Sequence, residues 1–260
     1  MRPLFASDIL RVWERGESQS PLDRALTLLE AGCPDRTREE LAMLSVAERD
    51  AALWSLRELS FGPQLDGFTE CPQCHERLEF TLDNIPGALA SRDVCFRNET
   101  FIEARQAGTP ALPGEYALEA EDMTVRFRLP NSHDLAKVAS CEDPEVARDL
   151  LAQRCVLEAH RDGATIHSEE LTVEIIARLV DRMAECAPQA EALMDFNCPA
   201  CGHCWQELFD IVMFFWIEIA AQAKRLLREV HTLARAYGWC EAEILALSPR
   251  RRQAYLEMVS

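Results

Sequence analysis

Two short cysteine motifs of the same form constrain this chain more than any other feature. "CPQC" carries Cys71 and Cys74, and "CPAC" carries Cys198 and Cys201. In such a motif one tight turn can aim two thiolates at a single ion while backbone N–H groups point back at the sulfurs. Four ligands of this kind make a closed tetrahedral site. We therefore predict one structural Zn²⁺ per chain, held by these four cysteines.

The residues beside the two motifs favour a shared metal site. A turn of this kind needs a residue that tolerates left-handed backbone after its second cysteine, and His75 and Gly202 stand there. A redox dithiol normally sits at a helix N-terminus, whereas Cys71 precedes a predicted strand. Redox-active or inert thiols are the alternatives to a metal site. Cys204, His75 and His203 are the alternative ligands, which we expect to lie near the metal without binding it.

The long separation of the two motifs indicates how the chain is organised. Residues 75–197 lie between them, far more than a zinc ribbon needs. A metal shared by both motifs would therefore clamp the base of an inserted subdomain. We expect a mainly α fold with a small β-containing insert and a split, zinc-ribbon-like clamp. The expected parts are an N-terminal helical region (1–66), the split knuckles (67–84 and 196–206), the inserted β-hairpin and helical subdomain (85–195), and a long helix with a helical tail (207–260).

Capping signals and apolar periodicity predict helices over most of the chain. A Ser-Pro pair at residue 20 and a Gly at residue 32 bound one helix, and Ser45 with Glu48 forms a capping box before another. The predicted helices are 21–32, a helix after Ser45 that stops at Phe61-Gly62, 144 to about 160, one that starts at Ser168, 207–237 ended by Gly238, and two short closing helices in "CEAEILAL" and "RRRQAYLEMV".

Alternating apolar residues predict a few strands between these helices. The stretch after "CPQC" places Leu78, Phe80 and Leu82 on one face. A second strand is predicted at 94–105, and "MTVRFRL" (123–129) reads as the second arm of a hairpin.

Composition excludes several kinds of partner. The formal net charge of -17 repels phosphates, which argues against nucleic acid and anionic membranes. The longest apolar run, 211–217, is far short of the roughly 18 residues that span a bilayer. Eleven cysteines without a signal peptide fit a reducing compartment. We therefore expect a cytoplasmic protein with no membrane partner.

Motifs of enzymes are missing from the sequence. It contains no glycine-rich phosphate loop, no H-E-x-x-H and no G-x-S-x-G. His133 and Asp134 could form an acid–base pair, but a helix cap is the better interpretation. We predict a protein that is not an enzyme and takes no small-molecule substrate.

Two segments are candidate partner surfaces. The helix in 207–237 has apolar residues on more than one face, of which a single core needs only part. The tail concentrates three arginines on one helical turn of an acidic chain, where a solvated face is the alternative. The candidate partner-binding residues are Phe215, Trp216, Arg250, Arg251 and Arg252.

Both ends of the chain resemble a known family. "LSVAERDAALWSLRELSFG" followed by a C-P-x-C motif is similar to the start of T-even-phage-type baseplate hub assembly chaperones. The matching positions are Arg49, Asp50 and Arg57, with Phe61-Gly62 at the helix end. The C-terminal "REVHTLARAYGWCEAEILALSPRRRQAYLEMV" resembles the ending of small proteins of contractile tails.

The resemblance covers about the first 85 and the last 60 residues and leaves 85–195 unplaced. It implies a cytoplasmic, non-enzymatic assembly factor or minor structural component that binds baseplate, hub or tail proteins of a contractile phage or injection system. One rival hypothesis is a zinc-ribbon regulator that binds nucleic acid, supported by the knuckles and the arginine triplet. The other is a zinc enzyme, which requires a three-ligand site with bound water.

Overall fold

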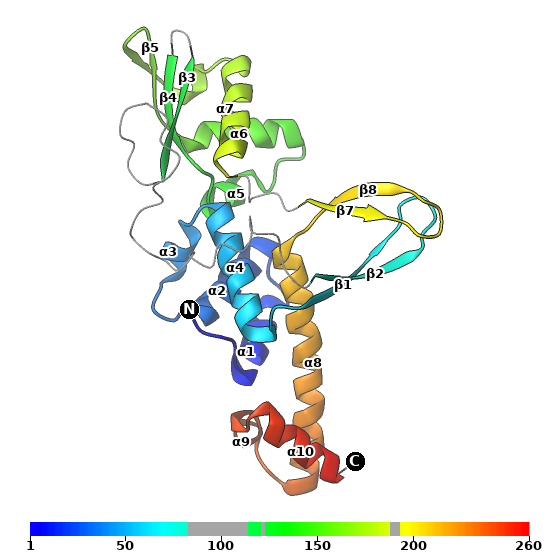
Figure 1. The fold of residues 1–260 in the computed structure, drawn as a ribbon. Helices are drawn as coiled ribbons and strands as arrows, with labels where there is room; N and C mark the ends of the chain where they lie inside the picture. Colours follow the sequence, from blue (N-terminus) through cyan, green and yellow to red (C-terminus); the bar gives the residue numbers. More distant parts are fainter. Residues whose placement is uncertain (83–113, 121–122, 188–192, 260) are drawn as a thin grey trace. The chain divides into compact units, whose positions relative to one another are not determined.

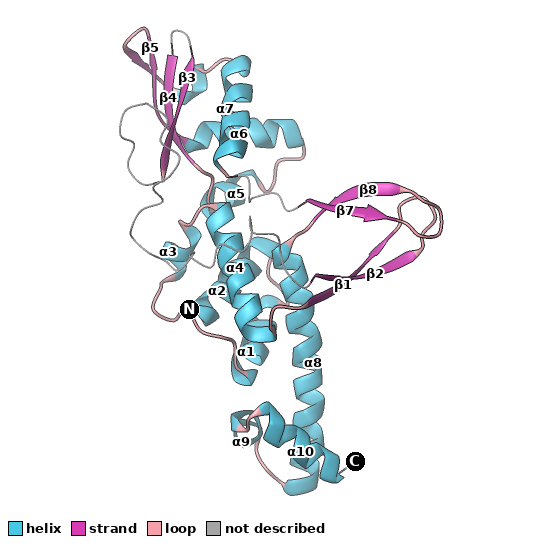
Figure 2. Cartoon of the chain, viewed as in Figure 1, coloured by secondary structure: helices cyan, strands magenta, loops and turns pink. Residues whose placement is uncertain are grey.

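The computed structural model describes residues 1–82, 114–120, 123–187 and 193–259 (Figure 1). The chain is mostly helical with small antiparallel sheets, as the sequence predicted (Figure 2). It divides into two compact units. Unit 1 comprises Met1–Arg38, Ala52–Ile85 and Leu193–Ser260, and unit 2 comprises Glu39–Ala51 and Pro86–Ala192.

The helices at the start of the chain begin and end where local signals place them. The Ser20 hydroxyl accepts a hydrogen bond from the backbone N–H of Asp23, and the Ser45 hydroxyl and the Glu48 carboxylate form the predicted capping box. Gly62, with φ +93°, ends the fourth helix in a conformation that favours glycine. The helices are α1 (Ala6–Gly16), α2 (Pro21–Gly32), α3 (Arg38–Ala42) and α4 (Val46–Phe61).

The longest helix, α8 (Ile211–Tyr237), packs in unit 1 against α1 and α2, and α9 (Glu241–Ala246) and α10 (Pro249–Val259) fold back onto it. Asp210 caps its first turn and Gly238, with φ +69°, ends it as predicted. The predicted start at 207 is wrong, because residues up to 208 pair as a strand. The buried face of α8 consists of Ile211, Val212, Phe215, Ile219, Ala223, Leu226 and Leu233.

Two antiparallel hairpins of unit 1, β1–β2 and β7–β8, form what we call the knuckle lobe (residues 65–82 and 193–208). The rings of Phe80 and Phe196 lie 5.4 Å apart, and the Thr69 hydroxyl donates to the Glu207 carboxylate at 2.6 Å. Gly67 faces the Phe80 ring so closely that a Cβ there would lie 2.4 Å from it. The strands are β1 (Leu65–Glu70), β2 (Arg77–Leu82), β7 (Leu193–Asn197) and β8 (Cys204–Leu208).

Unit 2 contains a four-stranded antiparallel sheet in the order β3-β4-β5-β6. Its core brings residues of the sheet together with residues of α6, α7 and the loop before α7. The elements are β3 (Glu115–Ala120), β4 (Met123–Arg128), α5 (Ser132–Val138), α6 (Pro144–Cys155), β5 (Val156–Arg161), β6 (Ala164–Ile166), a 3₁₀ turn (Ser168–Glu170) and α7 (Val173–Cys186). The buried cluster is Leu118, Met123, Val125, Phe127, Ala152, Ala159, Leu171, Ile176 and Leu179.

Two element predictions for unit 2 are wrong at their boundaries. The helix predicted to reach about residue 160 ends at Cys155, and the chain continues directly as β5. Ala159 pairs with Val125 of β4 and is buried. Residues 156–160 therefore form a strand of the sheet instead of continuing the helix. The helix predicted from Ser168 starts at Val173, after a 3₁₀ turn. The strand predicted at 94–105 lies outside the described residues.

Candidate metal centre

The four predicted cysteines come together at the turns of the two knuckle-lobe hairpins. Their Sγ atoms all lie within 4.8 Å of one another. The Sγ atoms of Cys71 and Cys201 are 3.7 Å apart, and those of Cys74 and Cys198 are 3.5 Å apart. Zinc–sulfur bonds of about 2.3 Å in a tetrahedron require sulfurs about 3.8 Å apart. The cluster therefore fits a Zn²⁺ ion.

The two turns are built alike. In the first, the N–H of His75 donates to the carbonyl of Cys71 at 2.9 Å, and the N–H of Cys71 donates to the carbonyl of Glu76 at 2.9 Å. His75 takes the left-handed conformation, with φ +62°, as predicted. The second turn repeats both bonds at 2.8 Å, from Gly202 to Cys198 and from Cys198 to His203, and Gly202 has φ +73°.

Backbone donors surround the thiols in the way that supports metal-bound thiolates. Burial raises the pKa of Cys71, but the N–H groups of Cys74 and Gln73 and the neighbouring thiols lower it to about 7. The N–H of Glu76 lowers the pKa of Cys74, whereas the thiols of Cys201, Cys198 and Cys71 together with burial raise it to about 12. Thiolates at this spacing repel one another and therefore resist ionising together. A divalent cation removes that repulsion, because it attracts each thiolate.

The number of sulfurs in the cluster limits the kind of metal site that it can form. Four protein sulfurs complete a tetrahedron, so a bound zinc would have no open position for water or substrate. Within the ranges that the structure describes, no other group of Cys, His, Asp or Glu side chains is arranged to hold a metal ion.

The alternative ligands lie outside this cluster. The His75 ring is 3.0 Å from the Glu70 carboxylate, and the His203 ring stacks on Trp205. Cys204 is exposed and is the first residue of β8.

The predicted partner-binding residues of the long helix have different environments. Phe215 is fully buried and packs edge-on against Phe61. Trp216 is half-buried, with the Arg24 guanidinium 4.5 Å from its ring centre. Trp216 also lies against Gly16, where a Cβ would be 2.4 Å from its ring. Phe215 therefore acts in packing in this structure, while Trp216 keeps part of its surface exposed.

The three tail arginines also differ. Arg250 and Arg251 are exposed, but Arg252 is only 4% exposed. The Arg252 Nε donates to the Glu229 carboxylate at 2.6 Å, and its Nη1 donates to the Leu247 carbonyl at 3.2 Å. Arg252 thus ties α10 to α8, and a solvated arginine face is limited to the other two.

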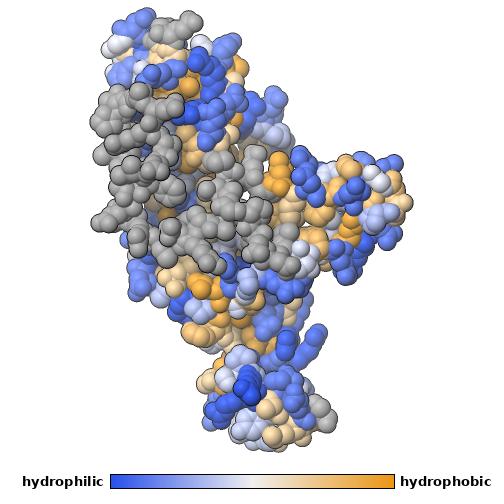
Figure 3. Space-filling model, in the orientation of Figure 1, coloured by the Kyte–Doolittle hydropathy of each residue, from blue (hydrophilic) through white to orange (hydrophobic). Residues whose placement is uncertain are grey.

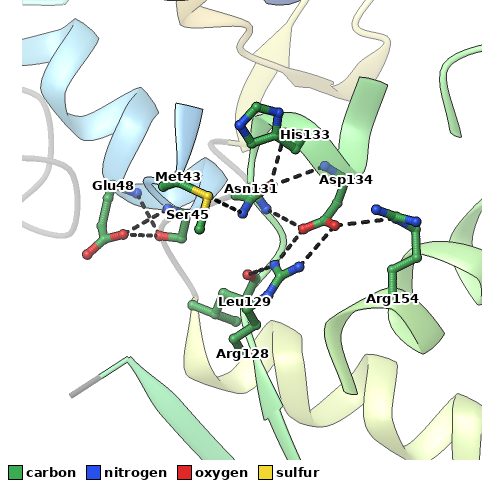
Figure 4. Close-up of polar contacts among 9 residues, drawn as sticks. All are labelled: Met43, Ser45, Glu48, Arg128, Leu129, Asn131, His133, Asp134 and Arg154. Atoms are coloured by element: carbon green, nitrogen blue, oxygen red, sulfur yellow. Dashed lines mark hydrogen bonds and ion pairs between the residues drawn. The ribbon is translucent and has the colours of Figure 1, made fainter. Parts of the chain in front are cut away.

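The structure places His133 and Asp134 in the first turn of α5; the N-cap is Asn131, and Asp134 completes the capping box. Asn131 accepts hydrogen bonds from the N–H groups of both residues, and the Asp134 carboxylate accepts from the N–H of Asn131. The guanidinium groups of Arg128 and Arg154 hold that carboxylate (Figure 4). The His133 ring points away from it (Figure 4).

Sequence reasoning placed Arg57 among the family-like positions but did not find its partner. Arg57 is 3% exposed and forms two bonds to the Glu218 carboxylate of α8, at 2.7 and 2.9 Å. It also donates to the carbonyls of Gly62 and Gln64. Its guanidinium therefore joins the end of α4 to α8 just before the knuckle lobe begins. Arg57 and Glu218 are 161 positions apart, so no local sequence pattern predicts that they pair.

A family described as T4 bacteriophage base plate protein matches residues 7–216. The chain belongs to the T4 bacteriophage base plate protein family. No curated protein and no solved structure matches it. The base plate match includes both knuckles and the segment 85–195, which the resemblance at the two ends had left unplaced. The C-terminal resemblance beyond residue 216 stays a prediction.

No helix among the described residues is long and apolar enough to cross a membrane.

Proposed function

We propose that this base plate family member is a non-enzymatic assembly factor or minor structural component of a contractile phage tail or injection system. It would act by binding baseplate, hub or tail proteins. The observation that carries this proposal is the family match over residues 7–216. The resemblance of Arg49, Asp50, Arg57 and Phe61-Gly62 to hub assembly chaperones supports the assembly role within that family.

The metal centre would serve this function by fixing the knuckle lobe. Cys71 and Cys74 would bind one Zn²⁺ together with Cys198 and Cys201. When bound, the ion supplies a cross-link between two hairpins that are far apart in the sequence. The chain's own part is to pre-position the thiols, through the two tight turns and the contact between Thr69 and Glu207. The lobe would then present a fixed surface to partners.

Co-expression with the proteins of a contractile tail tests this function. The tagged chain would be co-expressed in turn with each baseplate, hub and tail protein encoded in the same tail gene cluster. We expect at least one stable complex on size exclusion, with the zinc retained. A folded, zinc-loaded chain that binds none of these proteins would contradict the proposal.

Duplex DNA provides the comparison with the regulator hypothesis. A mobility shift is measured at low salt, where non-specific binding is strongest. We expect no shift, because a net charge of -17 repels phosphates. A specific shift that persists at 200 mM salt would favour the regulator and count against the assembly role.

A further inference from the structure

One face of α8 is exposed along most of the helix. Six residues at helical spacing share this face, which we call the α8 stripe. Met213 is 62% exposed, Ile217 59% and Leu227 38%, which is high for large apolar side chains. The α8 stripe consists of Met213, Ile217, Lys224, Leu227, Arg228 and His231.

The α8 stripe lies on the side of the helix away from its buried face. The opposite face of the helix carries the buried residues, among them Phe215, Ile219 and Leu226. The small, half-buried Ala220 lies between Ile217 and Lys224 and would allow another helix to approach closely. Spacing of three and four residues is the pattern by which one helix packs along another.

The charges of the stripe are unbalanced. Within the described part of the chain, neither Lys224 nor Arg228 forms an ion pair. The acidic residues of the same helix are both paired: Glu218 binds Arg57, and Glu229 binds two arginines. Although the chain has a net charge of -17, these two unpaired cations make a local positive patch on one face, and carboxylates of a partner can pair with it at short range.

We propose that the α8 stripe docks an amphipathic helix of a baseplate, hub or tail protein that carries acidic side chains beside its apolar stripe. The inference rests on the proposed function and names the surface and the chemistry of its partner. Met213 and Ile217 contact the apolar part of the partner helix. Lys224 and Arg228 pair with its carboxylates, and His231 adds a donor at the same end.

Two other occupants fit the stripe less well. A second copy packed in parallel would set Lys224 and Arg228 against their own copies. A copy packed antiparallel would set these cations against the apolar Met213 and Ile217, with no acidic partner. Nucleic acid is repelled by the net charge and gains nothing from the apolar half of the stripe.

The test uses the full chain and the tail-cluster protein that co-purifies with it. Ile217→Glu removes the apolar contact, and Lys224→Glu with Arg228→Glu reverses the charge. Each change is expected to weaken binding about tenfold or more, and the wild-type complex is expected to weaken with salt. Val173→Glu, at an apolar residue 70% exposed in unit 2, and Lys137→Glu, at the only other lysine, are the matched controls. Both controls should bind as the wild type does.

The possible outcomes distinguish a failure of the α8 stripe proposal from a failure of the proposed function. Charge-reversed variants that bind as the wild type does would overturn the assignment of the α8 stripe as the docking surface, but they would not contradict the proposed function. Restoration of the Lys224→Glu/Arg228→Glu complex by Glu→Lys changes in the partner helix would support the surface directly. A wild-type dimer in light scattering that Ile217→Glu dissociates would assign the stripe to a second copy and overturn the inference. A wild-type chain that binds no tail-cluster protein would contradict both the proposed function and the α8 stripe as its docking surface.

Discussion

The knuckle lobe and the unit 2 sheet are both antiparallel β structures, but they are held together differently. The sheet of unit 2 shares a buried cluster with α6 and α7, with Val125, Phe127 and Leu179 at most 1% exposed. In the knuckle lobe, the well-buried residues are Leu65, Thr69 and two of the cysteines. Its surface shows hydrophobic and hydrophilic residues side by side (Figure 3).

This difference indicates where each region gets its stability. A two-stranded hairpin is marginally stable alone, and the lobe consists of two of them. Leu193 and Leu208 face each other across β7 and β8 and are 54% and 58% exposed, so they add little to a core. We therefore expect the lobe to depend on a metal cross-link through its four cysteines, and unit 2 to depend on apolar burial.

Removal of the metal should have the largest effect, and only on the knuckle lobe. We expect the purified chain to carry about one zinc, and Cys71→Ser or chelation to cost on the order of 10 kcal/mol of local stability. Hydrogen exchange should then rise in 65–82 and 193–208 and stay unchanged in 123–187. Trp205, stacked between Phe196 and His203, should report the loss by fluorescence.

A metal-free chain with full exchange protection in the knuckle lobe would contradict this picture. So would a Cys71→Ser variant that keeps the wild-type protection, because the lobe would then hold together without its cross-link.

The reverse experiment removes an aromatic side chain from unit 2. Phe127 is fully buried and stacks on Tyr116, so Phe127→Ala should cost about 3–5 kcal/mol and raise exchange in 123–187. The zinc content should not change. Phe68→Ala is the matched control in the knuckle lobe, where Phe68 is 63% exposed under Arg77, and it should cost less than about 1 kcal/mol. Equal effects of the two changes would show that the regions do not differ as described.

Asp134 tests the polar support of unit 2. It is 1% exposed, and burial raises its pKa, but the bonds from Arg128 and from the N–H of Asn131 lower the pKa below its usual 3.8. Its ionised form therefore stabilises the folded state above about pH 4, and this contribution is lost as the pH falls through the lowered value.

Asp134→Asn should destabilise unit 2 by about 2 kcal/mol at pH 7, because it leaves the arginines without a charged partner. The difference from the wild type should shrink below pH 4. Hydrogen exchange of 123–187 measures this locally, since all five tryptophans lie in unit 1. A difference that stays constant between pH 7 and pH 3 would show that the carboxylate charge is not the cause.

The sequence predicted the features that depend on neighbouring residues. The caps at Ser20 and Ser45 and the left-handed residue after each second cysteine follow from local backbone chemistry. The four cysteines could be predicted as metal ligands because the two C-P-x-C motifs together supply the four thiols of a tetrahedral site. Local rules also placed the ends of α4 and α8 at glycines, Gly62 and Gly238.

Features that depend on pairing or packing with another segment were missed. β1, β7 and β8 are five or six residues long and acquire their shape only by pairing. No breaker residue separates Cys155 from Val156, so only the pairing of β5 with β4 ends α6 there. The sequence also could not predict which face of α8 is buried. Phe215 and Met213 are both large apolar residues, and only the elements that pack against the helix bury the first and leave the second exposed.

The smallest expected effect, at Cys204, bears most directly on the metal cross-link. Cys204 lies just after the second knuckle and is exposed, with its Sγ 3.8 Å from the carbonyl oxygen of Gly202. Cys204→Ser should leave the zinc content and the exchange of the knuckle lobe unchanged, within about 0.5 kcal/mol. The same substitution at Cys71 removes a ligand. If Cys204→Ser instead halved the metal affinity or more, the thiol would be a fifth candidate ligand. The lobe would then have an exchangeable site rather than a closed one.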